Sequence, residues 1–204
     1  MPLILDGTKG ETFPSWTTAT RPATPNTGQT GYNTTLNTLE VYDGTNWRQN
    51  YLNSATAQAS TSGTSIDFTG IPSWVKRITV MFDGVSTNGT SQPMIQLGDA
   101  GGVETTGYTT VSTSITTVAN ACTAYTNGWQ LFSGNAANVI QGNIVLNLIT
   151  GNIWSGNGIF STGVPNIIFT SGTKSLSETL TTVRITTAGG TDTFDAGSIN
   201  ILYE

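Results

Sequence analysis

Residues 27–49 constrain the fold most, because short alternating segments are separated there by turn residues. The pattern predicts a three-stranded meander with strands at 29–33, 38–42 and 46–49 and turns at 34–37 and 43–44. Asp43-Gly44 is a strong hairpin signal, since both residues tolerate a positive φ. Side chains alternate along a strand, so Leu39 and Val41 face away from Glu40, and one side of the meander is apolar.

Two large aromatic residues, Tyr32 and Trp47, flank this meander. A module of this size cannot bury them against itself, because below about 70–80 residues a core supplies only a few kcal/mol. We therefore expect a partner surface to cover the side chains of Tyr32, Val41, Tyr42 and Trp47.

Several short motifs resemble a small module that is common in fibre and appendage proteins of tailed bacteriophages. They are RPATP at 21–25, Gly28, GYN at 31–33, LEVY at 39–42 and DGTNW at 43–47. The opening LDGTKG at 5–10 also resembles the N-terminal segment of such fibres, although Lys9 stands where Asn is usual. Together these motifs cover about a quarter of the chain.

This resemblance implies a virion protein that forms a homotrimer. Because the N-terminus lacks the basic flank and apolar core of a signal peptide, assembly is expected in the host cytoplasm. The N-terminal segment would dock on other virion proteins, and the C-terminal β-domain would point outward. The trimer interface would then comprise Tyr32, Val41, Tyr42 and Trp47. The large apolar residues of the first segment suggest virion attachment or, alternatively, a first strand paired inside the domain; they are Leu3, Ile4, Leu5, Phe13 and Trp16.

Residues 1–52 are expected to form the attachment segment and meander, and the remaining chain predicts a linker followed by an all-β domain. Residues 53–63 have no large apolar side chain and are expected to link the two parts. From residue 64 to 204, strands recur every 8–14 residues with Gly or Asn turns, as in a jelly-roll-like β-sandwich. Residues 141–150 are apolar on both faces, which places them centrally in a sheet. Other side chains expected inside are Ile78, Val80, Phe82, Ile199, Ile201 and Tyr203.

Composition argues against several classes of function. Only 9% of the residues are charged, and among the seven basic residues only Lys76 and Arg77 are adjacent, so nucleic-acid binding is not expected. The absence of His removes the commonest general base and zinc ligand, and no cofactor or metal site is expected. No apolar run is long enough for membrane insertion. Cys122, the single cysteine, is expected to be a small buried residue.

Two pairs of carboxylates could in principle hydrolyse a glycosidic bond: Asp99 with Glu104, and Asp192 with Asp195. Both pairs lie among Gly and Thr in expected turns, where Asp caps backbone N–H groups. A calcium-binding loop is a further alternative. We expect turn capping and no enzymatic activity.

The segment 151–158 is expected to form a loop rich in Gly and Asn around Trp154. An aromatic ring can stack on a sugar while Asn152 and Asn157 bond its hydroxyls, so these residues form a candidate site for a host-surface glycan. Alternatively, Trp154 anchors the loop on the sandwich or lies in a trimer interface. The sequence thus predicts a short homotrimeric fibre whose tip contacts host glycan or protein; the alternative is a head-decoration, head-fibre or collar protein that binds only virion subunits.

Overall fold

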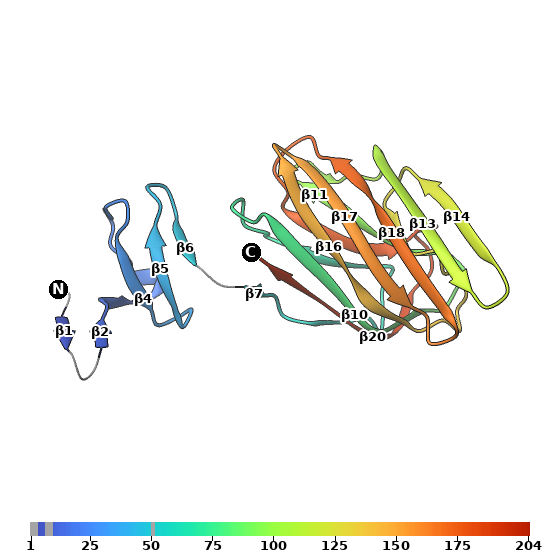
Figure 1. The fold of residues 1–204 in the computed structure, drawn as a ribbon, viewed down its shortest axis with the longest axis horizontal. Helices are drawn as coiled ribbons and strands as arrows, with labels where there is room; N and C mark the ends of the chain where they lie inside the picture. The colour runs from blue at the N-terminus through green and yellow to red at the C-terminus, as the bar shows by residue number, and fades with distance from the viewer. Residues whose placement is uncertain (1–3, 7–9, 50–51) are drawn as a thin grey trace. The chain divides into compact units, whose positions relative to one another are not determined.

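The computed structural model describes residues 4–6, 10–49 and 52–204, and for residues 4–6 and 10–12 it describes only the backbone. The chain divides into two compact units, Met1–Tyr51 and Leu52–Glu204, which we call the N-terminal and C-terminal units. Their regular secondary structure is almost entirely β-strand (Figure 1). The prediction of an all-β chain with a sandwich is confirmed.

The N-terminal unit contains a two-stranded and a four-stranded sheet. The smaller pairs β1 (Ile4–Asp6) with β2 (Gly10–Thr12). The larger has the order β3-β4-β5-β6, and its strands are β3 (Ser15–Trp16), β4 (Thr30–Asn33), β5 (Thr38–Tyr42) and β6 (Trp47–Gln49). Strands β4 to β6 match the predicted meander. Sequence analysis did not place β3, which runs parallel to β4 and leads into a 3-10 helix at Thr18–Thr20.

The predicted Asp43-Gly44 turn is longer than a two-residue hairpin. Tyr42 pairs with Trp47, and the Asp43 N–H donates to the Asn46 carbonyl at 3.0 Å. The Asp43 carboxylate accepts hydrogen bonds from the N–H groups of Thr45 and Asn46, and these bonds together with Arg48 lower its pKa to about 2. Gly44 supplies the left-handed conformation that the loop requires, with φ +100°.

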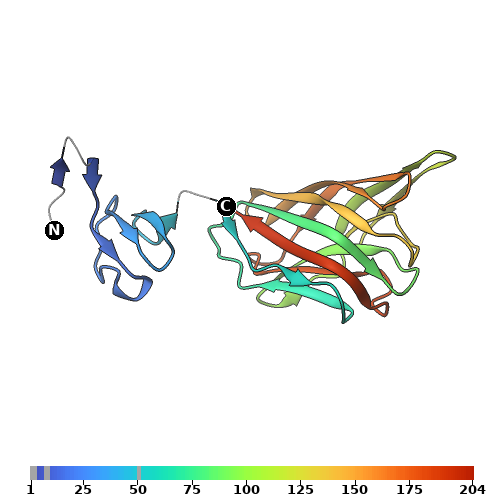
Figure 2. The same ribbon diagram turned by 90° about the horizontal axis from the view of Figure 1, so that it is seen from below.

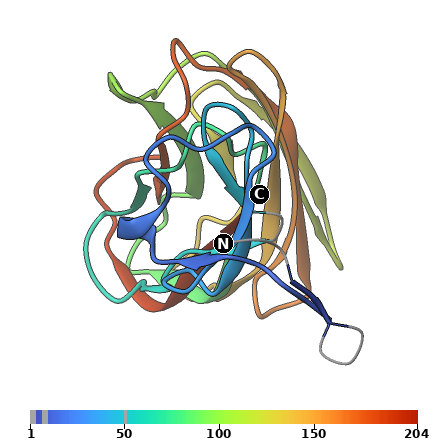
Figure 3. The ribbon, with the colours of Figure 1, turned by 90° about the vertical axis from the view of Figure 1, so that its left-hand side faces the viewer.

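The C-terminal unit is a sandwich of two antiparallel sheets. The larger has nine strands in the order β14-β13-β18-β17-β16-β10-β20-β7, with β8 also pairing β20. Its strands are β7 (Asn53–Ser54), β8 (Gln58–Ala59), β10 (Arg77–Thr87), β13 (Tyr108–Thr116), β14 (Asn120–Tyr125), β16 (Ile140–Thr150), β17 (Ile153–Ser161), β18 (Asn166–Ser175) and β20 (Phe194–Tyr203). Figure 3 shows strands β16 to β18, in orange, along one side of the sandwich.

The smaller sheet has five strands in the order β12-β11-β19-β9, with β15 also pairing β11. They are β9 (Ser65–Thr69), β11 (Pro93–Asp99), β12 (Gly102–Val103), β15 (Trp129–Gln130) and β19 (Thr182–Thr187). Strands β10 and β20 pair in the larger sheet, and their chain neighbours β11 and β19 pair in the smaller one. The connection from β10 to β11 and the connection from β19 to β20 therefore both pass from one sheet to the other, side by side, which is a jelly-roll-like feature.

The core between the sheets is apolar and continuous. As predicted, β16 is central, between β10 and β17, and the side chains of Ile78, Val80 and Phe82 point inward. Ile199 and Ile201 are also buried, and Tyr203 is half-buried. At the centre, Trp129 packs edge-on against Tyr108 with ring centroids 5.4 Å apart.

The expected linker at 53–63 belongs to the sandwich instead. Its strands β7 and β8 pair with β20, and we call residues 53–59 the strap (Figure 2, teal beside the red β20). The pairing uses backbone groups along an open sheet edge, so it leaves no pattern of apolar side chains in the sequence. The linker prediction was therefore wrong.

Two further predictions were wrong. Residues 151–158 form no loop, because only the turn at Gly151 and Asn152 separates β16 from β17. Cys122 is exposed, because it lies on β14, the edge strand of a hairpin that extends past its neighbours (Figure 2).

Candidate interaction surfaces

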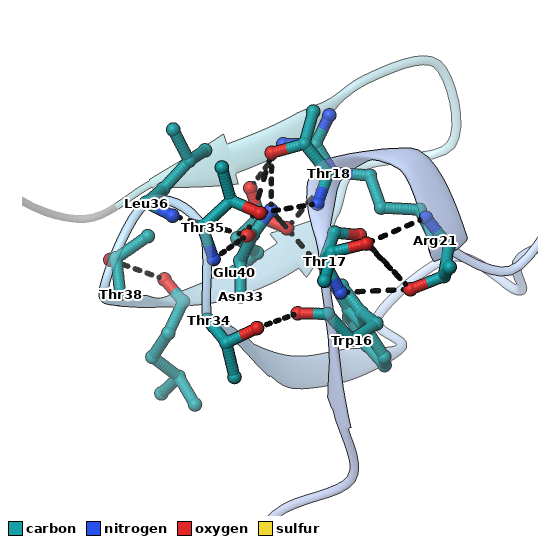
Figure 4. Close-up of polar contacts among 12 residues, drawn as sticks. Trp16, Thr17, Thr18, Arg21, Asn33, Thr34, Thr35, Leu36, Thr38 and Glu40 are labelled. Carbon is teal, nitrogen blue, oxygen red and sulfur yellow. Dashed lines mark hydrogen bonds and ion pairs between the residues drawn. The ribbon is translucent and has the colours of Figure 1, made fainter.

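The inner face of the four-stranded sheet carries a polar network around Glu40, which is fully buried (Figure 4). Glu40 Oε2 accepts hydrogen bonds from Trp16 Nε1 at 3.0 Å, Arg21 Nε at 3.0 Å and Asn33 Nδ2 at 3.1 Å. A second guanidinium N–H of Arg21 pairs with Oε1. Burial alone would raise the pKa of Glu40, but these partners outweigh it and hold the pKa below its ordinary value.

Trp16 occupies this face because residue 31 is a glycine. A Cβ on Gly31 would lie 2.0 Å from the Trp16 ring, so any side chain there would displace the indole. Trp16 is therefore buried within its own unit and unavailable for virion attachment, contrary to prediction. Phe13 is half-buried. Leu3 and the side chains of Ile4 and Leu5 lie outside the described residues.

The four residues predicted for the trimer interface lie on two different faces. Trp47 packs between Trp16 and Tyr42 in the same copy, with its ring centroid 4.8 Å from that of Trp16 and 5.4 Å from that of Tyr42. Tyr32 and Val41 lie on the opposite face together with Leu39, which pairs with Tyr32 across β4 and β5. The prediction that all four need another copy for cover was therefore wrong for Tyr42 and Trp47.

We call Tyr32, Leu39 and Val41 the outer row of the N-terminal unit. Their side chains are 36%, 40% and 38% exposed. The Tyr32 hydroxyl donates to Asn37 Oδ1 in the adjoining turn, which fixes the ring beside Leu39. The row is a compact apolar surface on a small unit, as expected for a protein contact.

The predicted glycan site is not assembled. Trp154 lies on β17 with its side chain turned into the core and only 3% exposed, so it offers no face to a sugar. Asn157 is on the opposite, exposed face of β17, while Asn152 is in the preceding turn, where its Nδ2 donates to the Ser177 carbonyl at 3.5 Å. Alternation along a strand separates Trp154 from Asn157, and this is why the prediction was wrong.

The outward side of β13, β17 and β18 forms a broad uncharged surface, which we call the sheet face. Its most exposed apolar side chains are 41–56% exposed and comprise Val111, Ile115, Ile159, Ile167 and Phe169, while Ile153, at the start of β17, is 38% exposed. Ile159 pairs with Phe169 and Ile115 pairs with Ile167, so the apolar groups form one patch across three strands. Within these fully described strands the single charged residue, Lys174, points inward and is buried.

The first carboxylate pair, Asp99 and Glu104, is brought together around Ser177. Ser177 Oγ donates to Asp99 at 2.6 Å, and its N–H donates to Glu104 at 2.7 Å. The hydrogen bond from Ser177 is the largest cause of a lowered pKa at Asp99; at Glu104, burial opposes the shift but Lys174 and Ser177 lower the pKa. Both carboxylates accept hydrogen bonds from backbone N–H groups, which matches the predicted capping role. The general acid of a glycosidase needs a raised pKa instead.

The second pair, Asp192 and Asp195, does not form a common site. Asp192 accepts from the Ser91 N–H at 2.7 Å, and Asp195 accepts from the Ser86 hydroxyl. In the part of the chain that the structure describes, no cluster of three or more His, Cys, Asp or Glu residues could hold a metal ion. That part also has no helix with the length and apolarity to span a bilayer.

Comparisons with models of known protein families, with curated proteins and with solved structures gave no match. The surfaces of this chain must therefore be interpreted from its own residues. Sequence analysis missed the Glu40 network, since its partners lie 7 to 24 residues away and share no periodic pattern. It also missed the sheet face. Apolar residues on both sides of a strand are typical of a strand that is buried on both faces, so the sequence does not show that one side is exposed.

Proposed function

We propose that the chain is a non-enzymatic structural protein of a bacteriophage virion, a short homotrimeric fibre that attaches by its N-terminus and displays the sandwich toward the host cell. The resemblance of residues 5–47 to fibre modules suggests this class. The outer row is the observation that carries the oligomeric part of the proposal.

The outer row supports self-association because the N-terminal unit cannot cover it. The inner face of the same sheet is already occupied by Trp16, Trp47 and the partners of Glu40. Tyr32, Leu39 and Val41 are thus left for an external surface, and identical copies related by symmetry supply the same patch to one another. Three copies also multiply weak host contacts, so each single contact needs little affinity.

Virion attachment is assigned to the beginning of the chain. With Trp16 committed to the N-terminal unit, the candidates from sequence analysis are Leu3, Ile4, Leu5 and Phe13. A fibre attached there leaves the C-terminal unit to present the sheet face and its loops.

Light scattering on the full chain tests the trimer. We expect a mass three times the 21.4 kDa of one chain. Val41→Asp places a carboxylate in the outer row, and we expect it to yield monomers with an unchanged circular dichroism spectrum, whereas Thr45→Asp on the exposed turn remains trimeric. A monomeric wild-type chain, or a trimeric Val41→Asp variant, would contradict the proposed interface.

The sheet face supports a second candidate function, in which the protein is a head-decoration, head-fibre or collar protein. Five exposed apolar side chains on one uncharged surface suit a permanent contact with another virion subunit. Labelled particles in electron micrographs would show whether the C-terminal unit projects or is covered. Inhibition of phage adsorption by the purified protein supports the fibre, whereas a lack of inhibition together with a covered C-terminal unit supports the alternative.

A further inference from the structure

A cavity of about 380 Å³ opens in the C-terminal unit between the strap and β9. The strap is held to β20 near both ends, where Ser54 pairs with Leu202 and Gln58 pairs with Ile199. β9 is the last strand of the smaller sheet, so the cavity lies where the two sheet edges diverge. A volume of this size is within the usual range for small-molecule sites, about 300–1,000 Å³.

The floor of the cavity is apolar and rigid. Phe68, Ile71 and Ile201 line it, and all three are buried in the core of the sandwich. Tyr203 forms a further wall and is half-buried, with its ring centroid 6.0 Å from that of Trp74. Packing on Trp74 fixes the ring of Tyr203, which gives the cavity a preformed aromatic surface.

The rim of the cavity is polar and has no net charge. Thr56 and Thr69 are exposed there, and the half-buried Gln58 donates from Nε2 to the Asp67 carbonyl at 2.9 Å, which leaves its amide oxygen free of that bond. The Asp67 carboxylate receives two hydrogen bonds from Arg184, at 2.8 and 2.6 Å, so its charge is balanced. Hydroxyl and amide groups around a neutral opening select a neutral, hydroxyl-rich ligand.

The turn after β9 keeps the mouth of the cavity open. Gly70 has φ +71°, and a Cβ added to it would meet no atom within 4 Å. Gly70 lines the cavity and is exposed, so no side chain narrows the mouth at this turn.

We propose that this cavity binds a neutral saccharide of one or two pyranose rings. The apolar face of a sugar ring would stack on Tyr203 above the floor of Phe68 and Ile201, and its hydroxyls would bond Gln58, Thr56 and Thr69. An anionic ligand is disfavoured because no Lys or Arg is among the residues that line the cavity, and Arg184, which bonds the lining residue Asp67, is already paired with it. A saccharide at this site would be the host receptor of the proposed fibre, and this part of the inference rests on the proposed function.

NMR with the full chain and a panel of neutral methyl glycosides tests the site. Methyl glucoside, methyl galactoside and methyl N-acetylglucosaminide are each titrated to millimolar concentration. We expect saturation transfer to at least one of them, with amide shifts confined to residues 55–58, 67–72 and 201–203. Tyr203→Leu removes the ring but keeps apolar cover, so it should weaken binding by up to about tenfold. Thr56→Phe fills the mouth from an exposed position and should abolish binding.

Two matched substitutions in the same unit serve as controls: Tyr125→Leu, at a half-buried Tyr, and Thr123→Phe, at an exposed Thr. Neither residue lines the cavity, so both variants should bind as the wild type does. Absence of saturation transfer from the whole panel, shifts that map to the sheet face, or unchanged binding by Tyr203→Leu and Thr56→Phe would each overturn the proposal. Binding of toluene without any glycoside would instead assign the cavity to apolar ligands and overturn it as well. The trimer mass measured by light scattering is independent of these outcomes, so the two proposals fail separately.

Discussion

The N-terminal and C-terminal units solve the same folding problem with different chemistry. In the N-terminal unit the buried centre is a carboxylate, Glu40, surrounded by donors from Trp16, Arg21 and Asn33. In the C-terminal unit the centre is apolar, with Trp129, Leu131 and many aliphatic side chains fully buried between two sheets. A unit of 51 residues cannot bury enough apolar surface to fold as the sandwich does, so directional bonds to a charge take over part of that role.

This difference predicts opposite sensitivities. A buried charge is stabilising only while its partners are in place, and loss of one partner leaves the others unsatisfied. An apolar core responds instead to changes of volume. Hydrogen exchange measured by mass spectrometry resolves the two units within the intact chain and is the natural readout.

Glu40→Ala should have the largest effect. It removes the acceptor of four N–H donors on three residues and should cost about 3 kcal/mol, the lower end for a broken buried pair, because Arg21 retains some access to water. That loss is comparable to the whole stability of so small a unit, so we expect amides of residues 13–49 to exchange freely while residues 64–204 stay protected. Thr45→Ala on the exposed turn is the control. Preserved protection in residues 13–49 would show that the network is dispensable.

Gly156→Ala tests the sandwich by overpacking. The added Cβ would lie 2.7 Å from the Trp129 ring and 2.8 Å from Leu146. We expect a loss of about 1–3 kcal/mol in urea unfolding of the C-terminal unit, with no change in exchange at residues 13–49. Asn157→Ala, at an exposed position on the same strand, should be nearly neutral. Equal effects of the two substitutions would argue against tight packing at Trp129.

Acid should destabilise the N-terminal unit through Glu40. Its pKa in the folded chain is below the ordinary value of 4.5, so the network contributes fully above that pH. As the pH falls below 4.5, the unfolded chain binds the proton first, and stability decreases until the folded carboxyl is also protonated. The effect should be smaller than that of Glu40→Ala, since protonated Glu40 still accepts hydrogen bonds.

Exchange at residues 13–49 between pH 6 and pH 3, corrected for the intrinsic rate, measures this loss. Glu40→Gln is the reference, because it keeps the shape but cannot titrate. Asp43 contributes acid sensitivity to both proteins, since its pKa is lowered to about 2. An identical pH dependence in wild type and Glu40→Gln would remove Glu40 as the cause.

Cys122 should give the smallest effect on stability. Because it is exposed on the edge strand β14, its thiol should react with Ellman's reagent in the native chain about as fast as in urea. Cys122→Ser should change the unfolding free energy by less than about 0.5 kcal/mol. Slow reaction in the native chain would mean that another copy covers the edge.

Sequence patterns predicted the fold where apolar residues follow a regular period along a strand. The alternation of Ile78, Val80 and Phe82 identified the inner face of β10, and the apolar residues on both sides of β16 placed it centrally. In the N-terminal unit, turn chemistry located β4 to β6. These features depend on neighbours in the chain and on period two, which a sequence displays directly.

Patterns failed where glycine replaces a side chain for reasons of packing. Gly156 and Gly158 suggested a loop around Trp154, but they lie in β17 because Trp129 covers one and Phe160 and Ile144 crowd the other. Gly31 likewise leaves space for the Trp16 ring, and this is why Trp16 is buried within its own unit. Such contacts join distant segments, and the sequence alone does not reveal which ring a glycine accommodates.

The strap has a mechanical consequence for a chain held at its beginning. Tension on the N-terminal unit enters the sandwich through Leu52 and is met first by the two pairs that join β7 to β20. These short pairs can separate, followed by those of β8, before the ladder between β9 and β19 bears any load. In a chain held at its beginning, release of the strap would lengthen the connection between the two units while the apolar core between the sheets stays intact.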